Sequence, residues 1–190
     1  MEADVIWLDG PKKLNIRKEF LKEPLDRELQ CKTIYTAIST GSELAHFTGL
    51  PELIPRKIKT PRQLGYCNVA EVVKVGKSIK DINIGQKILS FSTHRSAFNI
   101  DLEEVLYFLP NESDPKMIVT SYLFHLGYNA ILRSEIKLGS RVLIFGLGLL
   151  GITTTICCLN AGAETYVVSN NYKSFKLANK LGVKKIYSRS

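Results

Sequence analysis

A glycine-rich turn at residues 146–151 constrains the fold more than any other feature of this sequence. It reads Gly-Leu-Gly-Leu-Leu-Gly, follows the apolar run at 142–145 and opens a second apolar segment. A G-x-G-x-x-G pattern in this position predicts a strand, a tight turn and a helix within a βαβ unit that binds a dinucleotide. The alternative is a glycine turn in an α/β fold that binds no nucleotide. The predicted cofactor-binding residues of the turn are Gly146, Gly148, Leu149, Leu150 and Gly151.

The residues after the next predicted strand bear on the choice of cofactor. That strand covers 165–168, and Ser169, Asn170 and Asn171 follow it, with Lys173 just beyond. An Asp or Glu here would bind the ribose 2′-hydroxyl of NAD, and this stretch has neither. We therefore expect Ser169, Asn170 and Lys173 to contact the cofactor, with NADP favoured and NAD as the alternative. A solvated Lys173 with no role in binding is the simpler structural interpretation.

The order of the predicted elements divides the chain into two parts. The first 110 residues read as short strands separated by turns, such as 69–75 and 87–91, which predicts a small barrel or sandwich. A helix is then expected through the 117–132 region, followed by a β-α-β-α-β order with parallel strands and right-handed crossovers. The predicted domains are residues 1–118 and 119–190.

The chain is basic, with 26 Lys and Arg against 18 Asp and Glu, a formal net charge of +8. No Arg-rich helix, zinc finger or aromatic-basic repeat accompanies this charge, so nucleic acid is not an expected partner, and RNA binding remains a weaker hypothesis. The four cysteines form no CxxC pair and no secretory signal is evident, so we expect a cytoplasmic protein. The uncharged run at 142–163 matches a membrane span in length, but its glycines and threonines favour a strand, a turn and a helix.

Further segments resemble the medium-chain dehydrogenase/reductase superfamily of alcohol dehydrogenase-like and quinone reductase-like enzymes. They occur in the family's order across nearly the whole chain, at 72–76, 84–88, 106–110, 137–144 and 177–183. The resemblance implies an α/β protein in which a GroES-like β-barrel precedes a Rossmann doubly wound parallel sheet. Members of this family are roughly twice as long. We therefore expect an incomplete Rossmann sheet, with about three of its six strands.

The residues at the family's zinc positions are not zinc ligands in this chain. By the resemblance, Thr40 stands in place of a cysteine, Tyr66 in place of a histidine, and the third ligand falls near Tyr122. A catalytic zinc needs three protein ligands, usually His, Cys or a carboxylate, plus an open position. The family's structural-zinc lobe, with four close cysteines, has no counterpart in the sequence either. We therefore expect no bound metal.

Other side chains are then candidates for polarising the substrate or moving a proton. By the resemblance, Ser42 matches the family's proton-relay hydroxyl, and Glu43 matches the acid beside it. Tyr66 has a phenol that can donate a hydrogen bond, and His94 lies near where the family's first domain faces the cleft. Each has a simple structural alternative, namely stabilising a turn, packing or capping.

These observations predict a zinc-independent NAD(P)-dependent oxidoreductase. It would transfer hydride between the nicotinamide and a carbonyl or activated alkene of a small-molecule substrate. The alternative is an incomplete or non-catalytic nucleotide-binding or oligomerisation module, a fragment of a longer dehydrogenase. We also expect a homo-oligomer or a continuation of the chain, because half a parallel sheet leaves an edge and apolar faces exposed.

Overall fold

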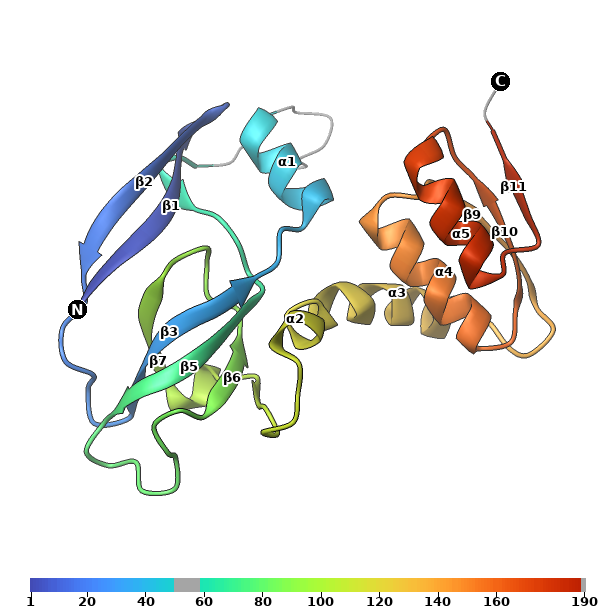
Figure 1. Cartoon of the computed structure of the whole chain (residues 1–190). Coiled ribbons are helices and arrows are strands. Elements are labelled where there is room, and N and C mark those ends of the chain that lie inside the picture. The colour runs from blue at the N-terminus through green and yellow to red at the C-terminus, as the bar shows by residue number, and fades with distance from the viewer. Residues whose placement is uncertain (50–58, 189–190) are drawn as a thin grey trace. The chain divides into compact units, whose positions relative to one another are not determined.

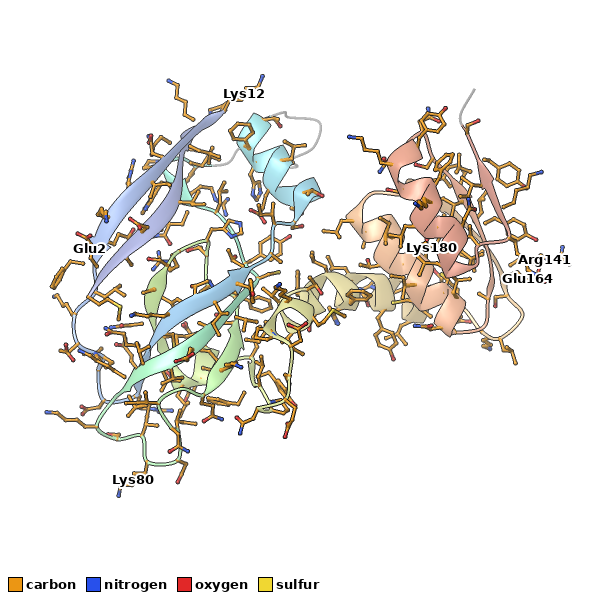
Figure 2. The ribbon with its side chains drawn as sticks, viewed as in Figure 1. Glu2, Lys12, Lys80, Arg141, Glu164 and Lys180 are labelled. Atoms are coloured by element: carbon orange, nitrogen blue, oxygen red, sulfur yellow. The ribbon has the colours of Figure 1, made fainter. Side chains whose placement is uncertain are left out.

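The computed structural model describes residues 1–49 and 59–188, and the chain divides into two compact units (Figure 1). Unit 1 is Met1–Thr120 and unit 2 is Ser121–Ser190. Each unit has its own sheets and its own hydrophobic core. Figure 2 shows the charged side chains of Lys12 and Lys80 pointing outward from their ribbons, as expected for solvated lysines.

Unit 1 is built on a five-stranded antiparallel sheet with the order β7-β3-β5-β6-β8. Its apolar strand residues fill a common core that includes Leu29, Val72, Ile88 and Phe98, each no more than 2% exposed. The strands are β3 (Glu28–Thr36), β5 (Asn68–Val75), β6 (Lys87–Ser90), β7 (Ala97–Asp101) and β8 (Tyr107–Phe108).

A second antiparallel sheet of unit 1 has the order β2-β1-β4. Its strands are β1 (Glu2–Gly10), β2 (Lys13–Phe20) and β4 (Arg62–Gln63). Strand β2 is exposed along almost its whole length. Its sequence alternates apolar and polar residues at Leu14 and Ile16, but these side chains are 48% and 71% exposed, so the alternation marks no buried face. The two sheets together confirm the β-rich first part of the predicted fold.

Among its described residues, unit 1 also contains the short helices α1 (Thr40–Thr48), η2 (Leu102–Glu104) and α2 (Pro115–Ile118). Helix α2 begins at a proline, and the Asp114 carboxylate before it accepts the Lys116 N–H at 2.9 Å. The single helix predicted through 117–132 is in fact two helices. The second is α3 (Ser121–Arg133), which belongs to unit 2.

Unit 2 contains three parallel strands with the order β11-β10-β9. This is the strand order of the first half of a doubly wound nucleotide-binding sheet, which confirms the predicted partial Rossmann fold. The strands are β9 (Arg141–Phe145), β10 (Glu164–Val168) and β11 (Lys185–Tyr187). Besides α3, the helices are α4 (Leu149–Asn160), η3 (Tyr172–Ser174) and α5 (Phe175–Leu181).

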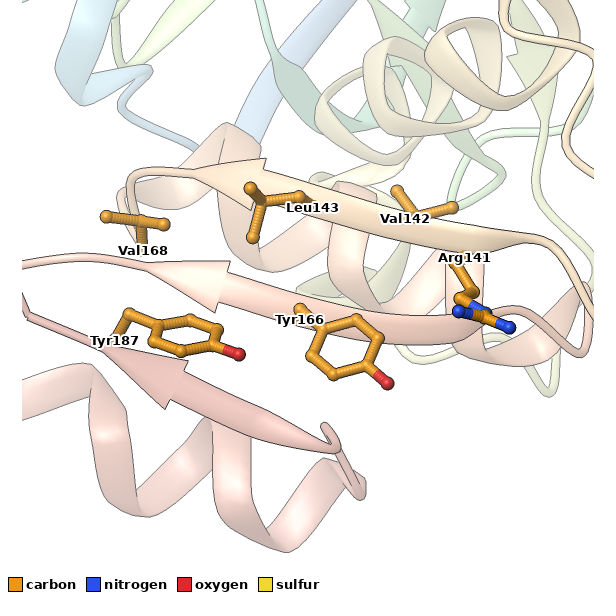
Figure 3. Close-up of a pocket in the computed structure, with 6 residues that line it drawn as sticks. All are labelled: Arg141, Val142, Leu143, Tyr166, Val168 and Tyr187. Carbon is orange, nitrogen blue, oxygen red and sulfur yellow. The ribbon is translucent and has the colours of Figure 1, made fainter.

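One face of the unit 2 sheet is covered by helices, and the other is open. Ile144 and Val167 pack in one core with buried residues of α3, α4 and α5. Because successive strand residues alternate between faces, Leu143 and Phe145 lie on the opposite face, where they are 49% and 67% exposed. A hollow of about 520 Å³ lies along this sheet, lined by Arg141, Val142, Leu143, Tyr166, Val168 and Tyr187 (Figure 3).

The uncharged run at 142–163 forms no single helix. It is divided between β9, the glycine-rich turn, α4 and the start of the loop that leads to β10. Within residues 1–49 and 59–188, no helix is both long and apolar enough to cross a membrane.

Candidate functional site

The glycine-rich turn joins the carboxyl end of β9 to the start of α4. Gly146 has a φ of +94°, a conformation that favours glycine, and its N–H donates to the Val168 carbonyl at 2.7 Å. A Cβ on Gly151 would overlap the carbonyl oxygen of Gly146 and lie 2.9 Å from its carbonyl carbon. Helix and strand can therefore approach this closely only because residue 151 is glycine.

Gly148 has neither of these structural reasons to be glycine. Its φ of −76° and ψ of −173° describe extended backbone that any residue adopts, and a Cβ there would have no atom of the described chain within 4 Å. It is the N-cap of α4, and no side chain among the described residues caps it. Free N–H groups and the helix dipole attract anions at such an end. The open space beside Gly148 therefore fits the close approach of a pyrophosphate.

The segment after β10 is hydrogen-bonded to the glycine-rich turn. The N–H groups of Leu147 and Asn171 both donate to Ser169 Oγ, at 3.3 Å and 3.0 Å. Ser169 is buried, so its hydroxyl supports the turn. Asn170 and Lys173 lie exposed on the same segment, where a ligand can reach them.

Sequence reasoning missed two polar side chains of this segment. Asn171 Nδ2 donates to the Leu147 carbonyl at 3.0 Å and to Ser174 Oγ at 2.8 Å. Ser174 Oγ also donates to the Leu147 carbonyl, at 3.1 Å. A run of Ser and Asn directly after a strand is typical of side chains that hydrogen-bond to nearby backbone, and that pattern is the signal that could have identified them.

Two predicted catalytic residues of unit 1, Glu43 and His94, are in contact although they lie 51 positions apart. His94 Nε2 is 2.6 Å from Glu43 Oε2, and the two side chains are 6% and 7% exposed. Helix α1 carries Glu43, whose Oε1 also accepts the Ser39 N–H at 2.7 Å. A carboxylate and an imidazole held together away from water form an arrangement suited to general acid–base chemistry.

Thr36 extends this contact toward the surface. Its Oγ1 lies 2.6 Å from His94 Nδ1 and donates to the Cys67 carbonyl at 2.8 Å. With the hydroxyl proton directed at Cys67, Nδ1–H must be the donor to Thr36. Glu43, His94 and Thr36 thus form a hydrogen-bonded chain from a buried carboxylate to an exposed residue at the end of β3. Burial, and then the Glu43 carboxylate, raise the pKa of the Cys67 thiol to about 11.

Glu43 and His94 line a pocket of about 280 Å³ in unit 1. Apolar walls with one acid–base pair are typical of small-molecule sites. The hollow of unit 2 is larger, but it lies along a sheet face rather than at the carboxyl ends of the strands, where nucleotides bind. The other residues that line the unit 1 pocket are Ile6, Leu14, Ile38, Thr40, Leu44, Phe47 and Leu64.

Gly65 determines where His94 can lie. Its φ is +95°, and a Cβ there would come within 2.6 Å of His94 N and 2.7 Å of the ring atoms Cγ and Nδ1. The His94 N–H donates to the Leu64 carbonyl at 2.7 Å, so the neighbouring residue also holds the His94 backbone. The absence of a side chain at residue 65 therefore lets the imidazole occupy its position against Glu43.

The other two predicted catalytic residues, Ser42 and Tyr66, also belong to unit 1. Ser42 is exposed on α1, and Tyr66 is half-buried between β4 and β5. Arg95, the chain neighbour of His94, forms an ion pair with Glu19 at 3.4 Å and donates to Gln63 Oε1 at 2.6 Å, so these contacts hold its side chain within unit 1. Of the four predicted catalytic residues, the structure thus brings two into contact.

The residues at the family's zinc-ligand positions have other surroundings in this structure. Thr40 opens α1, and Tyr122 of α3 stacks on His125 with ring centroids 6.2 Å apart. Within residues 1–49 and 59–188, no group of three or more His, Cys, Asp or Glu side chains is arranged to hold a metal.

Comparisons with known proteins agree with this architecture. No protein-family model matches the chain. (R,R)-Butanediol dehydrogenase of Bacillus subtilis (strain 168) is 24% identical over 204 residues, which cover 88% of this chain and 59% of the relative. The solved 2R,3R-butanediol dehydrogenase from Bacillus subtilis superposes with a TM-score of 0.82 and 21% identity, over 98% of this chain and 63% of the other. The chain has the fold of the medium-chain dehydrogenases.

Two further structures with this fold were solved with a cofactor. CAD from Helicobacter pylori, complexed with NADP(H), has a TM-score of 0.81 and 14% identity over 98% of this chain and 64% of its own. The alcohol dehydrogenase RspB of Escherichia coli CFT073, complexed with NADH, has a TM-score of 0.83 and 14% identity over 100% of this chain and 63% of its own. The chain thus spans about three-fifths of the length of these relatives.

Proposed function

We propose that this chain binds a nicotinamide dinucleotide at the glycine-rich turn and serves a hydride-transfer reaction. The observation that carries the proposal is Gly148. Its backbone conformation suits any residue and its surroundings leave room for a side chain, so nothing in the described chain requires glycine there. A ligand that must touch the backbone does require it. The relatives named as dehydrogenases support the same reading of the fold.

Each part of the turn would have its own task in binding. Gly146 and Gly148, with the first N–H groups of α4, would hold the pyrophosphate, because these groups offer donors and a positive dipole end. When bound, the nicotinamide supplies or accepts the hydride. NADP is the favoured cofactor, because residues 169–174 contain no carboxylate to repel a 2′-phosphate and do contain the exposed Lys173. The NADP(H) complex of CAD supports this choice, whereas the NADH complex of RspB keeps NAD as the alternative.

In unit 1, the Glu43–His94 pair would handle the proton that accompanies hydride transfer. The substrate would be a small molecule with a carbonyl or an activated alkene, and the apolar pocket beside the pair favours an uncharged body. The proposed chemistry needs no zinc, since Thr40 and Tyr66 replace ligands and the pair supplies a proton donor or acceptor.

A nucleotide titration tests this function directly. Isothermal titration with NADPH and with NADH should give saturable binding to the wild-type chain, tighter for NADPH. Gly148→Ala should lose about tenfold or more in affinity, because the methyl group takes the ligand's space. Its melting temperature should fall by only a few degrees, since alanine at the N-cap of α4 costs about 0.5–1 kcal/mol relative to glycine. Gly41→Ala is a matched control, since its Cβ also has no neighbour among the described atoms within 4 Å and its affinity should not change. Absence of binding by both nucleotides would overturn the proposal.

A second candidate is a nucleotide-binding module without hydride transfer of its own. The open face of the unit 2 sheet favours it, because parallel sheets are normally covered on both faces. This module would bind NADPH with the same Gly148 dependence. It would show no substrate-dependent change in NADPH absorbance with any carbonyl or alkene substrate, and measurable turnover would exclude it.

A further inference from the structure

Leu147, the residue between the first two glycines of the turn, is fixed by both core packing and hydrogen bonds. The Leu147 side chain is 1% exposed and packs in the core of unit 2. Its N–H donates to Ser169 Oγ, and its carbonyl oxygen accepts from Asn171 Nδ2 at 3.0 Å and Ser174 Oγ at 3.1 Å. The backbone that shapes the candidate phosphate site is thus fixed by side chains of the segment that follows β10.

Asn171 makes more of these connections than any other residue of that segment. A carboxamide nitrogen has two N–H donors, and both are used, one by the Leu147 carbonyl and one by Ser174 Oγ at 2.8 Å. The backbone N–H of Asn171 donates to Ser169 Oγ at 3.0 Å. A single residue therefore joins the glycine-rich turn, the end of β10 and the helix η3.

Lys173 lies inside the segment that these bonds hold. Asn171 precedes it and Ser174 follows it, and both are tied to the same carbonyl oxygen of Leu147. Lys173 is exposed on η3. Its backbone is consequently fixed relative to the turn, whereas its ammonium group is free to meet a ligand.

We propose that Asn171 is a positioning residue that couples the glycine-rich turn to Lys173, and that Lys173 rather than Ser169 binds the 2′-phosphate of NADP. The inference rests on the proposed dinucleotide function. Ser169 Oγ already accepts two backbone N–H groups, so it contributes mainly to the turn. A lysine on a fixed backbone loses less freedom when it binds a phosphate than one on a mobile loop.

The test is a double-mutant cycle on nucleotide affinity. Asn171→Ala and Lys173→Ala should each reduce the ratio of NADPH to NADH affinity about fivefold to tenfold, the range expected for loss of a charged hydrogen bond. In the Lys173→Ala background, Asn171→Ala should leave that ratio unchanged, because its effect acts through the lysine. Asn179→Ala, an exposed asparagine on α5, is the control and should not change the ratio.

Hydrogen exchange on the unliganded protein gives a second readout. Asn171→Ala and Ser174→Ala should each speed exchange of the amides at 146–148, and Asn179→Ala should not. Ser174→Ala also serves if Asn171→Ala fails to fold. Wild-type protein that binds neither nucleotide overturns the proposed function, and this inference with it. Wild-type binding with an NADPH-to-NADH ratio that Asn171→Ala leaves unchanged, or with additive effects in the cycle, overturns the inference alone.

Discussion

An alanine at position 65 would press a methyl group against the imidazole of His94. Its Cβ would lie 2.7 Å from the ring atoms Cγ and Nδ1, whereas optimal carbon contacts are about 3.5 Å or longer. The ring must move, which stretches its two 2.6 Å contacts with Glu43 and Thr36. Weakening two hydrogen bonds costs about 1–3 kcal/mol. The φ of +95° adds about 1–3 kcal/mol for a non-glycine residue. We expect Gly65→Ala to lower the free energy of unfolding by about 2–6 kcal/mol.

Gly85→Ala separates the two contributions to that loss. Gly85 has a φ of +91°, and a Cβ there would have no described atom within 4 Å, so this variant carries the backbone cost alone. Urea unfolding followed by the fluorescence of Trp7, the single tryptophan, reports on unit 1 in both variants. The loss in Gly65→Ala should exceed that in Gly85→Ala by about 1–3 kcal/mol. Equal losses would refute the argument that the missing side chain at residue 65 holds the His94 ring.

Three further predictions concern the proton path, a buried thiol and helix packing. Glu43→Gln should lower turnover about 10²- to 10⁴-fold in a steady-state assay while leaving the NADPH dissociation constant unchanged. If turnover and NADPH affinity fall by the same factor, Glu43 does not act in proton transfer. The pKa of Cys67 is raised to about 11 from 9.0, so between these pH values the folded state keeps a proton that the unfolded chain has lost. The free energy of unfolding should therefore fall by up to about 2–3 kcal/mol as pH rises from 9 to 11. Urea unfolding at each pH measures this fall, which should be less steep in the Cys67→Ala variant. A Cβ on Gly127 would lie 2.9 Å from backbone atoms of Thr153 and Thr154, so Gly127→Ala should force α3 and α4 apart and cost about 1–3 kcal/mol. An unchanged melting temperature of that variant by circular dichroism would contradict the close packing.

The elements that the sequence predicted well are those with a buried face. The strand predicted at 69–75 is β5 (Asn68–Val75), and the one at 165–168 is β10 (Glu164–Val168). Strand β2 was not predicted, because it has no buried apolar row and forms by pairing with β1. Helix α1 was not predicted, because Gly41 and three Ser or Thr residues lower its helix propensity. Tertiary contacts such as that of Glu43 with His94 compensate for this low propensity.

The candidate site was predictable in its residues but not in its contacts. The sequence indicated Glu43 and His94 separately, and only the folded chain brings them within 2.6 Å. That approach depends on a positive φ at Gly65, which no periodicity records. The sequence predicts Ser169 as a cofactor-binding residue, but it does not indicate that the buried Ser169 hydroxyl accepts the Leu147 N–H. Long-range polar contacts of this kind depend on packing, so a local pattern cannot specify them.

The three glycines of the turn carry different information about ligand binding. Gly146 is required by its φ of +94°, and Gly151 by the carbonyl of Gly146, so any tight strand-to-helix turn of this shape would keep both. Neither therefore distinguishes a binding site from a purely structural turn. Gly148 alone has an ordinary conformation and open surroundings, and its missing side chain serves nothing within the described chain. A G-x-G-x-x-G match thus indicates a nucleotide chiefly through its second glycine. The effect of Gly148→Ala on affinity therefore decides between the two interpretations of this turn, provided that the variant loses no more stability than an N-cap alanine costs.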